Sequence, residues 1–149
     1  MKKLLLFLLS SSFAFGQLSQ DSIQKIAKKK FEEDYVATRF KDPYSYEFKN
    51  IWSTVTTVEE NWEAILRSDK SYTESTYANK KFVKQMKDTL KKHQAQLDIL
   101  NEAQRKSVYI YNIFIDAYGA NSYGNKVLGR YIIKLYPNGK LYGGPEKYN

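Results

Sequence analysis

The chain has no cysteine among its 149 residues. Small exported proteins often depend on disulfides, so this chain must be stable through packing alone. The same absence excludes cysteine metal sites, cysteine nucleophiles and a lipid anchor attached to a cysteine. Beyond the first 16 residues, no apolar run approaches the roughly 20 residues that a membrane span requires. We therefore expect no transmembrane span after residue 16.

Histidine is almost absent as well, because His93 is the only one. It could act as a general base or pH switch. A packing role is the favoured interpretation, since no serine, cysteine or second histidine is placed to work with it. The acidic run Glu32–Asp34 points in several directions around a helix, so it does not assemble a metal site. We expect neither a metal nor another cofactor.

Acidic residues are fewer than basic ones, 16 against 24, which gives a formal net charge of +8. Such an excess favours acidic partners, for example an acidic polymer or an envelope or extracellular protein. A lysine face at helical spacing carries much of it. A solubilising surface is the favoured interpretation of this face, and binding to an acidic polymer, a lipid surface or an acidic protein is the alternative. Nucleic acid is not expected, because aromatic residues do not interleave with these lysines. The lysine face comprises Lys80, Lys84, Lys87 and Lys91.

The N-terminus has the pattern of a secretory signal peptide over residues 1–16. Lys2 and Lys3 precede an apolar stretch of about a dozen residues, which is too short for a membrane-spanning helix. Small residues then predict cleavage near Gly16-Gln17. We expect a secreted or periplasmic protein, and one α+β domain over residues 17–149.

Apolar periodicity predicts two helices. The first begins with Asp21 as its N-cap and Gln24 three residues later, and it stops near Lys41 before Pro43. The second runs from about 76 to 106, with a heptad seam over 83–100. Residues 59–74 fit either a short helix or a hairpin.

Alternating β-branched and aromatic residues predict strands that cluster in sequence. The Asn-Gly pair at 138–139 indicates a tight hairpin turn, and a frayed tail is expected after 142. The fold class is therefore α+β, with an N-terminal helix, a long central helix and an antiparallel sheet of about three to four strands. The expected strands are 44–58, 108–117, 127–136 and 141–142.

Two local patterns resemble small, largely uncharacterised exported proteins of Bacteroidota-type bacteria. One is the Asp-Pro-x-Ser-x-x-Phe pattern that begins at Asp42. The other is the Gly-x-Asn-Ser-x-Gly pattern that begins at Gly119. The resemblance implies export and an α+β order, and it implies no particular activity.

The Gly/Asn-rich loop after residue 117 is the preferred ligand-binding site, because loops often carry binding function. A purely structural role in turn formation is nevertheless the favoured interpretation of this loop. The candidate residues are Tyr118, Asn121, Tyr123, Asn125 and Arg130.

No catalytic residues are predicted, and the leading hypothesis is an exported, non-enzymatic binding or interaction module. Tyrosine and asparagine suit recognition surfaces. One alternative is a carboxylate-dependent hydrolase of cell-envelope polymers, with Asp116 and Glu47 as the acids. Another is a structural protein that self-associates through the 83–100 seam.

Overall fold

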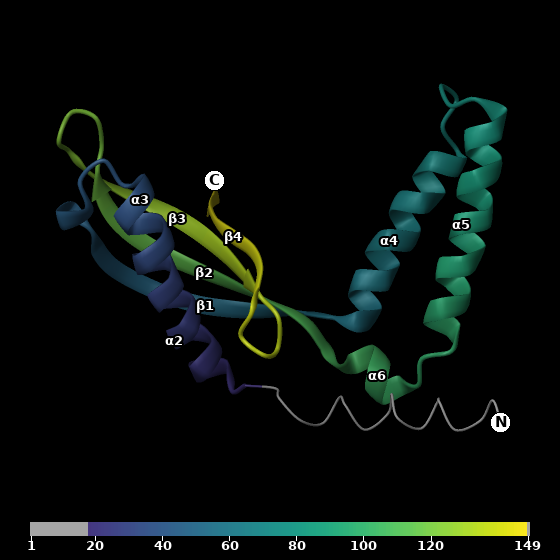
Figure 1. Cartoon of the computed structure of the whole chain (residues 1–149), viewed down its shortest axis with the longest axis horizontal. Helices are drawn as coiled ribbons and strands as arrows, with labels where there is room; N and C mark the ends of the chain where they lie inside the picture. Colours follow the sequence, from purple (N-terminus) through teal and green to yellow (C-terminus); the bar gives the residue numbers. More distant parts are fainter. Residues whose placement is uncertain (1–17, 149) are drawn as a thin grey trace. The chain divides into compact units, whose positions relative to one another are not determined.

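A computed structural model describes residues 18–148, which form two compact units (Figure 1). The sheet unit comprises the chain up to Val55 together with the chain from Ile110 onward. The helical unit comprises Thr56–Tyr109 and is inserted between two strands. The predicted signal peptide at 1–16 lies outside the described residues. The prediction of one domain over 17–149 stays a prediction.

The sheet has four strands in the order β1-β2-β3-β4, so each strand lies beside its neighbour in sequence. The sheet is antiparallel, and together with the helices it confirms the α+β class. The strands are β1 (Glu47–Thr57), β2 (Val108–Ala120), β3 (Lys126–Leu135) and β4 (Leu141–Tyr148).

The frayed tail predicted after residue 142 is wrong, because this segment belongs to β4. Backbone pairing places Tyr148 opposite Arg130 and Lys147 opposite Tyr131. The register between β3 and β4 shifts around Lys134. Two glycines and a proline, which are rare in strands, gave this segment no strand pattern in the sequence. Hydrogen bonds with its partner strand β3 stabilise it instead.

One face of the sheet forms the core beneath the N-terminal helix. The β2–β3 register pairs Ile113 with Ile133 and Ile115 with Tyr131, which puts their side chains on one face. The ring of Phe31, from the helical segment, lies 4.8 Å from that of Tyr131. The fully buried side chains are mostly large and apolar, as close packing requires. They include Ile23, Ala27, Phe31, Ile113, Ile115, Ala117, Ile133 and Leu135.

The N-terminal helix consists of α2 (Gln20–Lys30), a wider-turned segment η1 (Phe31–Val36) and a last turn α3 (Ala37–Arg39). The predicted N-cap at Asp21 is wrong. Ser19 is the N-cap, because its side chain accepts a hydrogen bond from the Ser22 backbone N–H. The helix ends before Pro43 as predicted, with Phe40 already extended.

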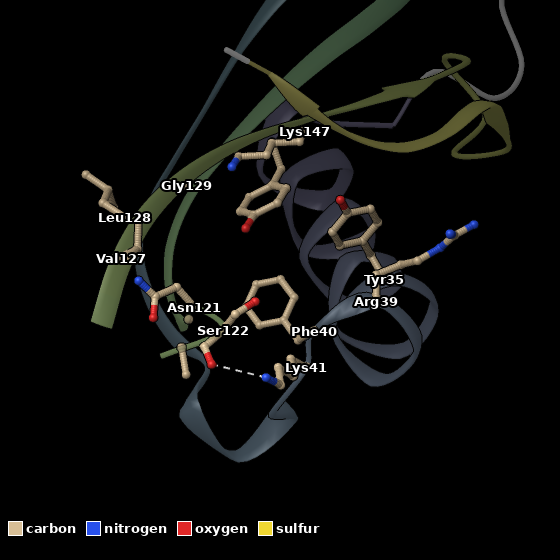
Figure 2. A pocket seen from close by; sticks show the side chains of 13 residues that line it. Tyr35, Arg39, Phe40, Lys41, Asn121, Ser122, Val127, Leu128, Gly129 and Lys147 are labelled. Carbon is tan, nitrogen blue, oxygen red and sulfur yellow. Dashed lines mark hydrogen bonds between the residues drawn. The ribbon is translucent and has the colours of Figure 1, made fainter. Parts of the chain in front are cut away.

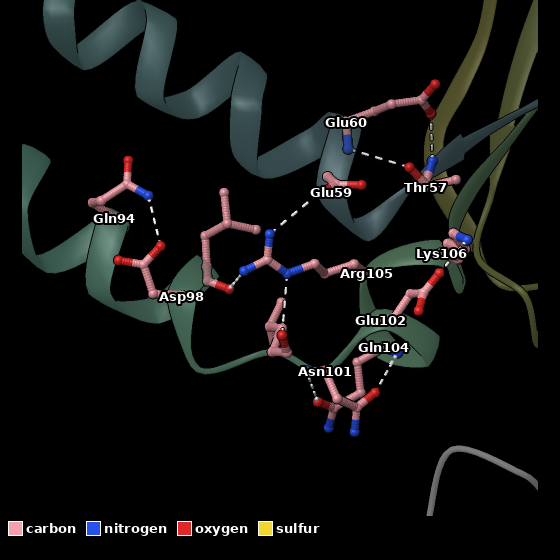
Figure 3. A network of polar contacts seen from close by, with 12 residues as sticks. Thr57, Glu59, Glu60, Gln94, Asp98, Asn101, Glu102, Gln104, Arg105 and Lys106 are labelled. Carbon is pink, nitrogen blue, oxygen red and sulfur yellow. Dashed lines mark hydrogen bonds and ion pairs between the residues drawn. The ribbon is translucent and has the colours of Figure 1, made fainter.

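The ambiguous stretch 59–74 is helical, as α4 (Val58–Thr73). Thr57 and Glu60 form a capping box, in which each side chain accepts a hydrogen bond from the other residue's backbone N–H (Figure 3). This reciprocal cap satisfies two backbone donors at the start of the helix. The Thr-x-x-Glu spacing was therefore the signal that favoured a helix over a hairpin.

The predicted continuous helix from 76 to 106 is wrong, because it is two helices, α5 (Lys80–Asp98) and α6 (Glu102–Lys106). Asn101 is the N-cap of α6 and forms a capping box with Gln104. Arg105 donates to the backbone oxygens of Leu97 (3.0 Å) and Leu100 (3.1 Å) at the end of α5. Figure 3 shows the Arg105 hydrogen bonds at the end of α5 and the capping box at the start of α6.

Helices α4 and α5 pack as an antiparallel hairpin. The rings of Trp62 and His93 lie 5.6 Å apart near one end, and those of Tyr72 and Phe82 lie 6.1 Å apart near the other. A hydrogen bond of 2.6 Å joins Nδ1 of His93 to the buried carboxylate of Asp69. His93 thus contacts both an aromatic ring and a carboxylate on α4.

The described helices do not meet the requirements of a membrane span. Over residues 18–148, none combines the length and the apolar character needed to cross a bilayer.

Candidate functional site

The sheet unit contains a pocket of about 350 Å³ where the end of the N-terminal helix meets the ends of β2 and β3 (Figure 2). Binding pockets for small molecules commonly begin near this size. The lining combines aromatic, cationic and backbone groups from both halves of the unit. It comprises Tyr35, Arg39, Phe40, Lys41, Gly119, Ala120, Asn121, Ser122, Val127, Leu128, Gly129, Tyr131 and Lys147.

Two glycines allow aromatic rings to lie against the strands that line this pocket. A β-carbon on Gly119 would lie 2.6 Å from the ring of Phe40, and one on Gly129 would lie 2.6 Å from the hydroxyl of Tyr131. Such separations are far inside van der Waals contact, so both positions need glycine for this packing. The Phe40 and Tyr131 ring centroids are 5.8 Å apart.

The turn after the helix is fastened to the strand end by hydrogen bonds. The Tyr44 backbone N–H donates to the side chain of Asp42 (3.0 Å), which fixes the turn at η2 (Pro43–Ser45). The Ala120 backbone N–H then donates to the Ser45 hydroxyl at 2.8 Å. The Asp-Pro-x-Ser pattern therefore has a structural role, because it holds the helix end beside the pocket.

A third fastening comes from Lys41, whose ammonium donates to the backbone oxygen of Ser122 at 3.2 Å. Figure 2 draws this bond across one side of the pocket. It ties the segment after α3 to the β2–β3 loop, so that two segments 81 residues apart share one wall.

The charge of the lining has one sign. Arg39, Lys41 and Lys147 are cationic, and none of the lining residues carries a carboxylate. Desolvation by burial raises the pKa of Tyr131, and the neighbouring Tyr35 raises it further. Tyr131 therefore keeps its phenol proton at neutral pH and remains able to donate a hydrogen bond.

Of the five loop residues predicted from sequence, Asn121 is the one that lines the pocket. Its side-chain oxygen accepts from the backbone N–H groups of Tyr123 (2.9 Å) and Asn125 (3.0 Å), so it also shapes the loop. Tyr123 is 89% exposed. Asn125 contributes to the loop through its backbone, because its carbonyl oxygen accepts a hydrogen bond from the Asn121 N–H.

The other two predicted residues, Tyr118 and Arg130, lie on the sheet face opposite the N-terminal helix. Lys49 and Lys126 lie over the ring of Tyr118, at 5.5 and 4.8 Å from its centroid. The guanidinium of Arg130 lies 4.7 Å from the centroid of Trp52. The structure therefore divides the five candidates between a pocket, a loop and a sheet face.

Strand β1 contributes to that face through a shift in its alternation. Lys49 lies over Tyr118 and Trp52 stacks on Phe114, although Tyr118 and Phe114 share one face of β2. Residues three apart in a regular strand point to opposite faces. Strand β1 therefore contains one extra residue between Lys49 and Trp52, as in a β-bulge.

Both acids of the hydrolase hypothesis are engaged in ion pairs. Asp116 is buried and accepts two hydrogen bonds from the Arg130 guanidinium, at 2.9 and 3.3 Å. Glu47 pairs with Lys126. The two hydrogen bonds from Arg130 hold the Asp116 carboxylate in one orientation across the β2–β3 pair.

The predicted basic face divides between two hollows of the helical unit. Lys80, Lys84 and Lys87 line a shallow one of about 360 Å³ with Ala78 and Val83. Lys91 belongs to another, of about 540 Å³, between α4 and α5. As for metals, residues 18–148 hold no group of three or more acidic or histidine side chains able to bind an ion.

Sequence analysis did not predict most of the residues that line the pocket. Arg39 and Phe40 end the first helix, while Tyr131 and Lys147 lie about 90 residues or more further along the chain. One signal was available, because Arg39-Phe40-Lys41 places two cations around an aromatic ring just before the Asp-Pro turn. No local sequence pattern indicates that Lys147 belongs to the same pocket.

Comparisons with protein-family models, with curated proteins and with solved structures found no match to this chain. The functional argument therefore rests on the geometry of the pocket and on the surfaces described above.

Proposed function

We propose that this protein is an exported, non-enzymatic binding module whose pocket takes a small organic anion with a flat apolar part. The observation that carries the proposal is the composition of the lining: three cations, three aromatic rings and no carboxylate in one pocket. The cations attract an anionic group such as phosphate, sulfonate or carboxylate. The rings of Tyr35, Phe40 and Tyr131 offer the apolar contact.

The partners of the pocket's cations support this assignment. Lys41 contacts a backbone oxygen, which leaves its positive charge without compensation by a carboxylate. Lys147 and Arg39 are exposed at the rim, where a ligand can reach them. An anion that bridged these groups would gain charge-assisted hydrogen bonds, which are stronger than neutral ones.

The hydrolase alternative has less support from the geometry. A general acid needs a carboxyl group that can exchange a proton with a substrate. Asp116 instead holds Arg130 through both of its oxygens. The self-association alternative is weakened in a similar way, since side chains of the 83–100 seam, such as His93, already contact α4.

Phenyl phosphate is a suitable probe, because it joins a phosphate to one aromatic ring. We expect it to shift the backbone amide resonances of Gly119 and Gly129 in NMR spectra, and benzyl alcohol, its neutral counterpart, to shift them far less. The double variant Arg39→Gln/Lys147→Gln should weaken phenyl phosphate binding by about tenfold or more, equivalent to roughly 1.4 kcal/mol.

The matched control is Arg67→Gln/Lys140→Gln, which removes the same charge at exposed positions outside the pocket. Binding that falls equally in both double variants would mean general charge attraction. That result, or equal affinity for benzyl alcohol, would contradict a dedicated anion pocket.

Export is tested separately by mass spectrometry of the native protein. We expect its first residue to be Gln17, as cleavage after the predicted signal peptide requires. A native chain that retains Met1 would refute the cleavage.

A further inference from the structure

The α4–α5 hairpin has an unusual concentration of exposed aromatic side chains where its two helices join. Tyr77, in the connecting turn, is fully exposed, and Tyr72 and Phe82 are 49% and 38% exposed. The Tyr72 and Phe82 rings touch edge to face across the two helices. We call this region, residues 70–88, the hairpin end.

The hairpin end is also basic. Residues 70–88 contain five lysines and two acidic residues. One of the acids, Glu74, is already paired with Lys70, at 3.9 Å. The other acid, Asp88, can offset only one further charge, so the remaining four lysines keep a net positive charge. They are Lys80, Lys81, Lys84 and Lys87.

Apolar surface continues between these lysines. Lys80, Lys84 and Lys87 surround a shallow hollow with Ala78 and Val83, and most of its surface is apolar. Long lysine side chains can lie along such a surface while their ammonium groups reach outward to anions. Ala78, which lines this hollow, follows the fully exposed Tyr77 in the chain, so the ring of Tyr77 adjoins one end of the lysine-lined surface.

This combination matches the headgroup layer of a membrane. Tyrosine is enriched there because its ring enters the apolar boundary while its hydroxyl stays hydrated. Lysines near an anionic bilayer surface gain electrostatic attraction. The hollow beside the turn is open to solvent, and a lipid surface can deform around such a convex helix end.

We propose that the hairpin end docks on membranes rich in anionic phospholipid, with Tyr77 entering the headgroup layer and the lysines contacting lipid phosphates. The charge complementarity selects anionic lipid, and the exposed rings select a bilayer over a soluble polyanion. The site lies in the helical unit, so it stands independently of the pocket in the sheet unit.

The test is co-sedimentation with vesicles of equal parts phosphatidylglycerol and phosphatidylcholine, compared with phosphatidylcholine alone. The full chain is measured alongside residues 17–149, which contain every described residue, because the apolar run at 1–16 could itself enter a bilayer. We expect binding to the anionic vesicles, without the leader, to exceed binding to neutral ones by about a hundredfold.

Two variants locate the surface. Lys80→Gln/Lys84→Gln/Lys87→Gln should lower the affinity by about a hundredfold, at roughly fivefold for each lysine. Tyr77→Ser should lower it severalfold by removing the inserted ring. All four positions are exposed, so the fold should persist, which circular dichroism will verify.

Controls with the same chemistry lie elsewhere in the chain. Lys25→Gln/Lys29→Gln/Lys140→Gln removes the same charge from exposed positions of the sheet unit outside its pocket. Tyr44→Ser removes a ring that is 98% exposed there. Both should bind anionic vesicles nearly as well as the unaltered chain.

Three results with vesicles would overturn the proposal. They are equal binding to neutral vesicles, an equal loss in the control triple variant, and no effect of Tyr77→Ser. Binding to soluble poly-glutamate without vesicle binding would assign the lysines to an acidic polymer instead, and it would equally refute lipid docking.

Discussion

Gly119 and Gly129 show how single residues shape the pocket. Each lies where an aromatic ring passes closer than a β-carbon allows. The sequence suggested turn chemistry for this glycine-rich stretch, yet neither of these two glycines has a positive φ. Their role is to permit close approach, which no local pattern could reveal.

Gly119→Ala should destabilise the sheet unit by about 1–3 kcal/mol, because its new methyl group must displace the Phe40 ring from its aromatic cluster. Urea unfolding followed by NMR signals of the sheet unit measures the loss. Gly144→Ala is the control, since a β-carbon there has nothing within 4 Å. Equal stability of the two variants would show that the ring moves aside freely.

Buried phenols make the same unit sensitive to alkali. Burial raises the pKa of Tyr131 above its ordinary 10.0. The pKa of Tyr46 is raised too, by burial and by its hydrogen bond to Glu32. In the unfolded chain these phenols ionise near their ordinary pKa, so the unfolded state binds fewer protons above it.

Stability should therefore be fully present below about pH 10 and should decline as the pH rises further. Urea unfolding at about pH 8 and about pH 11 measures the decline. Tyr131→Phe should make the decline shallower, because it removes one of the responsible phenols. Tyr123→Phe, at an exposed position, should leave it unchanged. An identical decline in both variants would exclude Tyr131 as a cause.

At the scale of elements, capping residues determine where the helices begin and end, which apolar periodicity does not reveal. The heptad spacing over 83–100 is real, and it packs α5 on α4. It also concealed the break between Asp98 and Glu102, where Asn101 starts a new helix. The Asn-x-x-Gln spacing was present in the sequence, as was Thr-x-x-Glu at 57–60.

Asn101→Ala should destabilise the helical unit by about 1 kcal/mol, the usual consequence of losing an N-cap. Denaturant unfolding monitored by the fluorescence of Trp62, with Trp52 replaced by Phe, reports on this unit. Gln96→Ala, at an exposed position within α5, should change stability by less than about 0.5 kcal/mol. A loss no larger than that of Gln96→Ala would show that the cap is dispensable.

At the scale of the whole molecule, the helical unit is an insertion between two adjacent strands. β1 and β2 are hydrogen-bonded neighbours, although the intervening helices separate them by 50 residues in sequence. Two units with separate contacts suggest that each can be altered without the other.

Replacing Thr56–Tyr109 by an Asn-Gly turn should therefore leave a folded four-stranded sheet, because this pair closes antiparallel hairpins well. Retained phenyl phosphate binding, together with strand signals in circular dichroism, would support this. A shortened chain that is unfolded would mean that the sheet unit depends on the insertion. The full chain, measured in parallel, sets the reference for both signals.

The sequence by itself determined the secondary-structure class, the first helix and its end before Pro43, and the hairpin between β3 and β4. These features depend on neighbouring residues, whose periodicity and turn chemistry act locally. It did not determine where β4 ends, because that strand is stabilised by its partner and its own composition opposes it.

Tertiary structure alone decided the pocket and the pairing of its groups. Arg39, Tyr131 and Lys147 come from three elements, and they meet because the sheet register places Tyr131 opposite Lys147 beneath the helix end. Asp116, a candidate acid by sequence, pairs with Arg130 because the β2–β3 register places the two residues opposite each other. Such meetings depend on long-range strand pairing and close packing, which bring distant residues together without any local pattern.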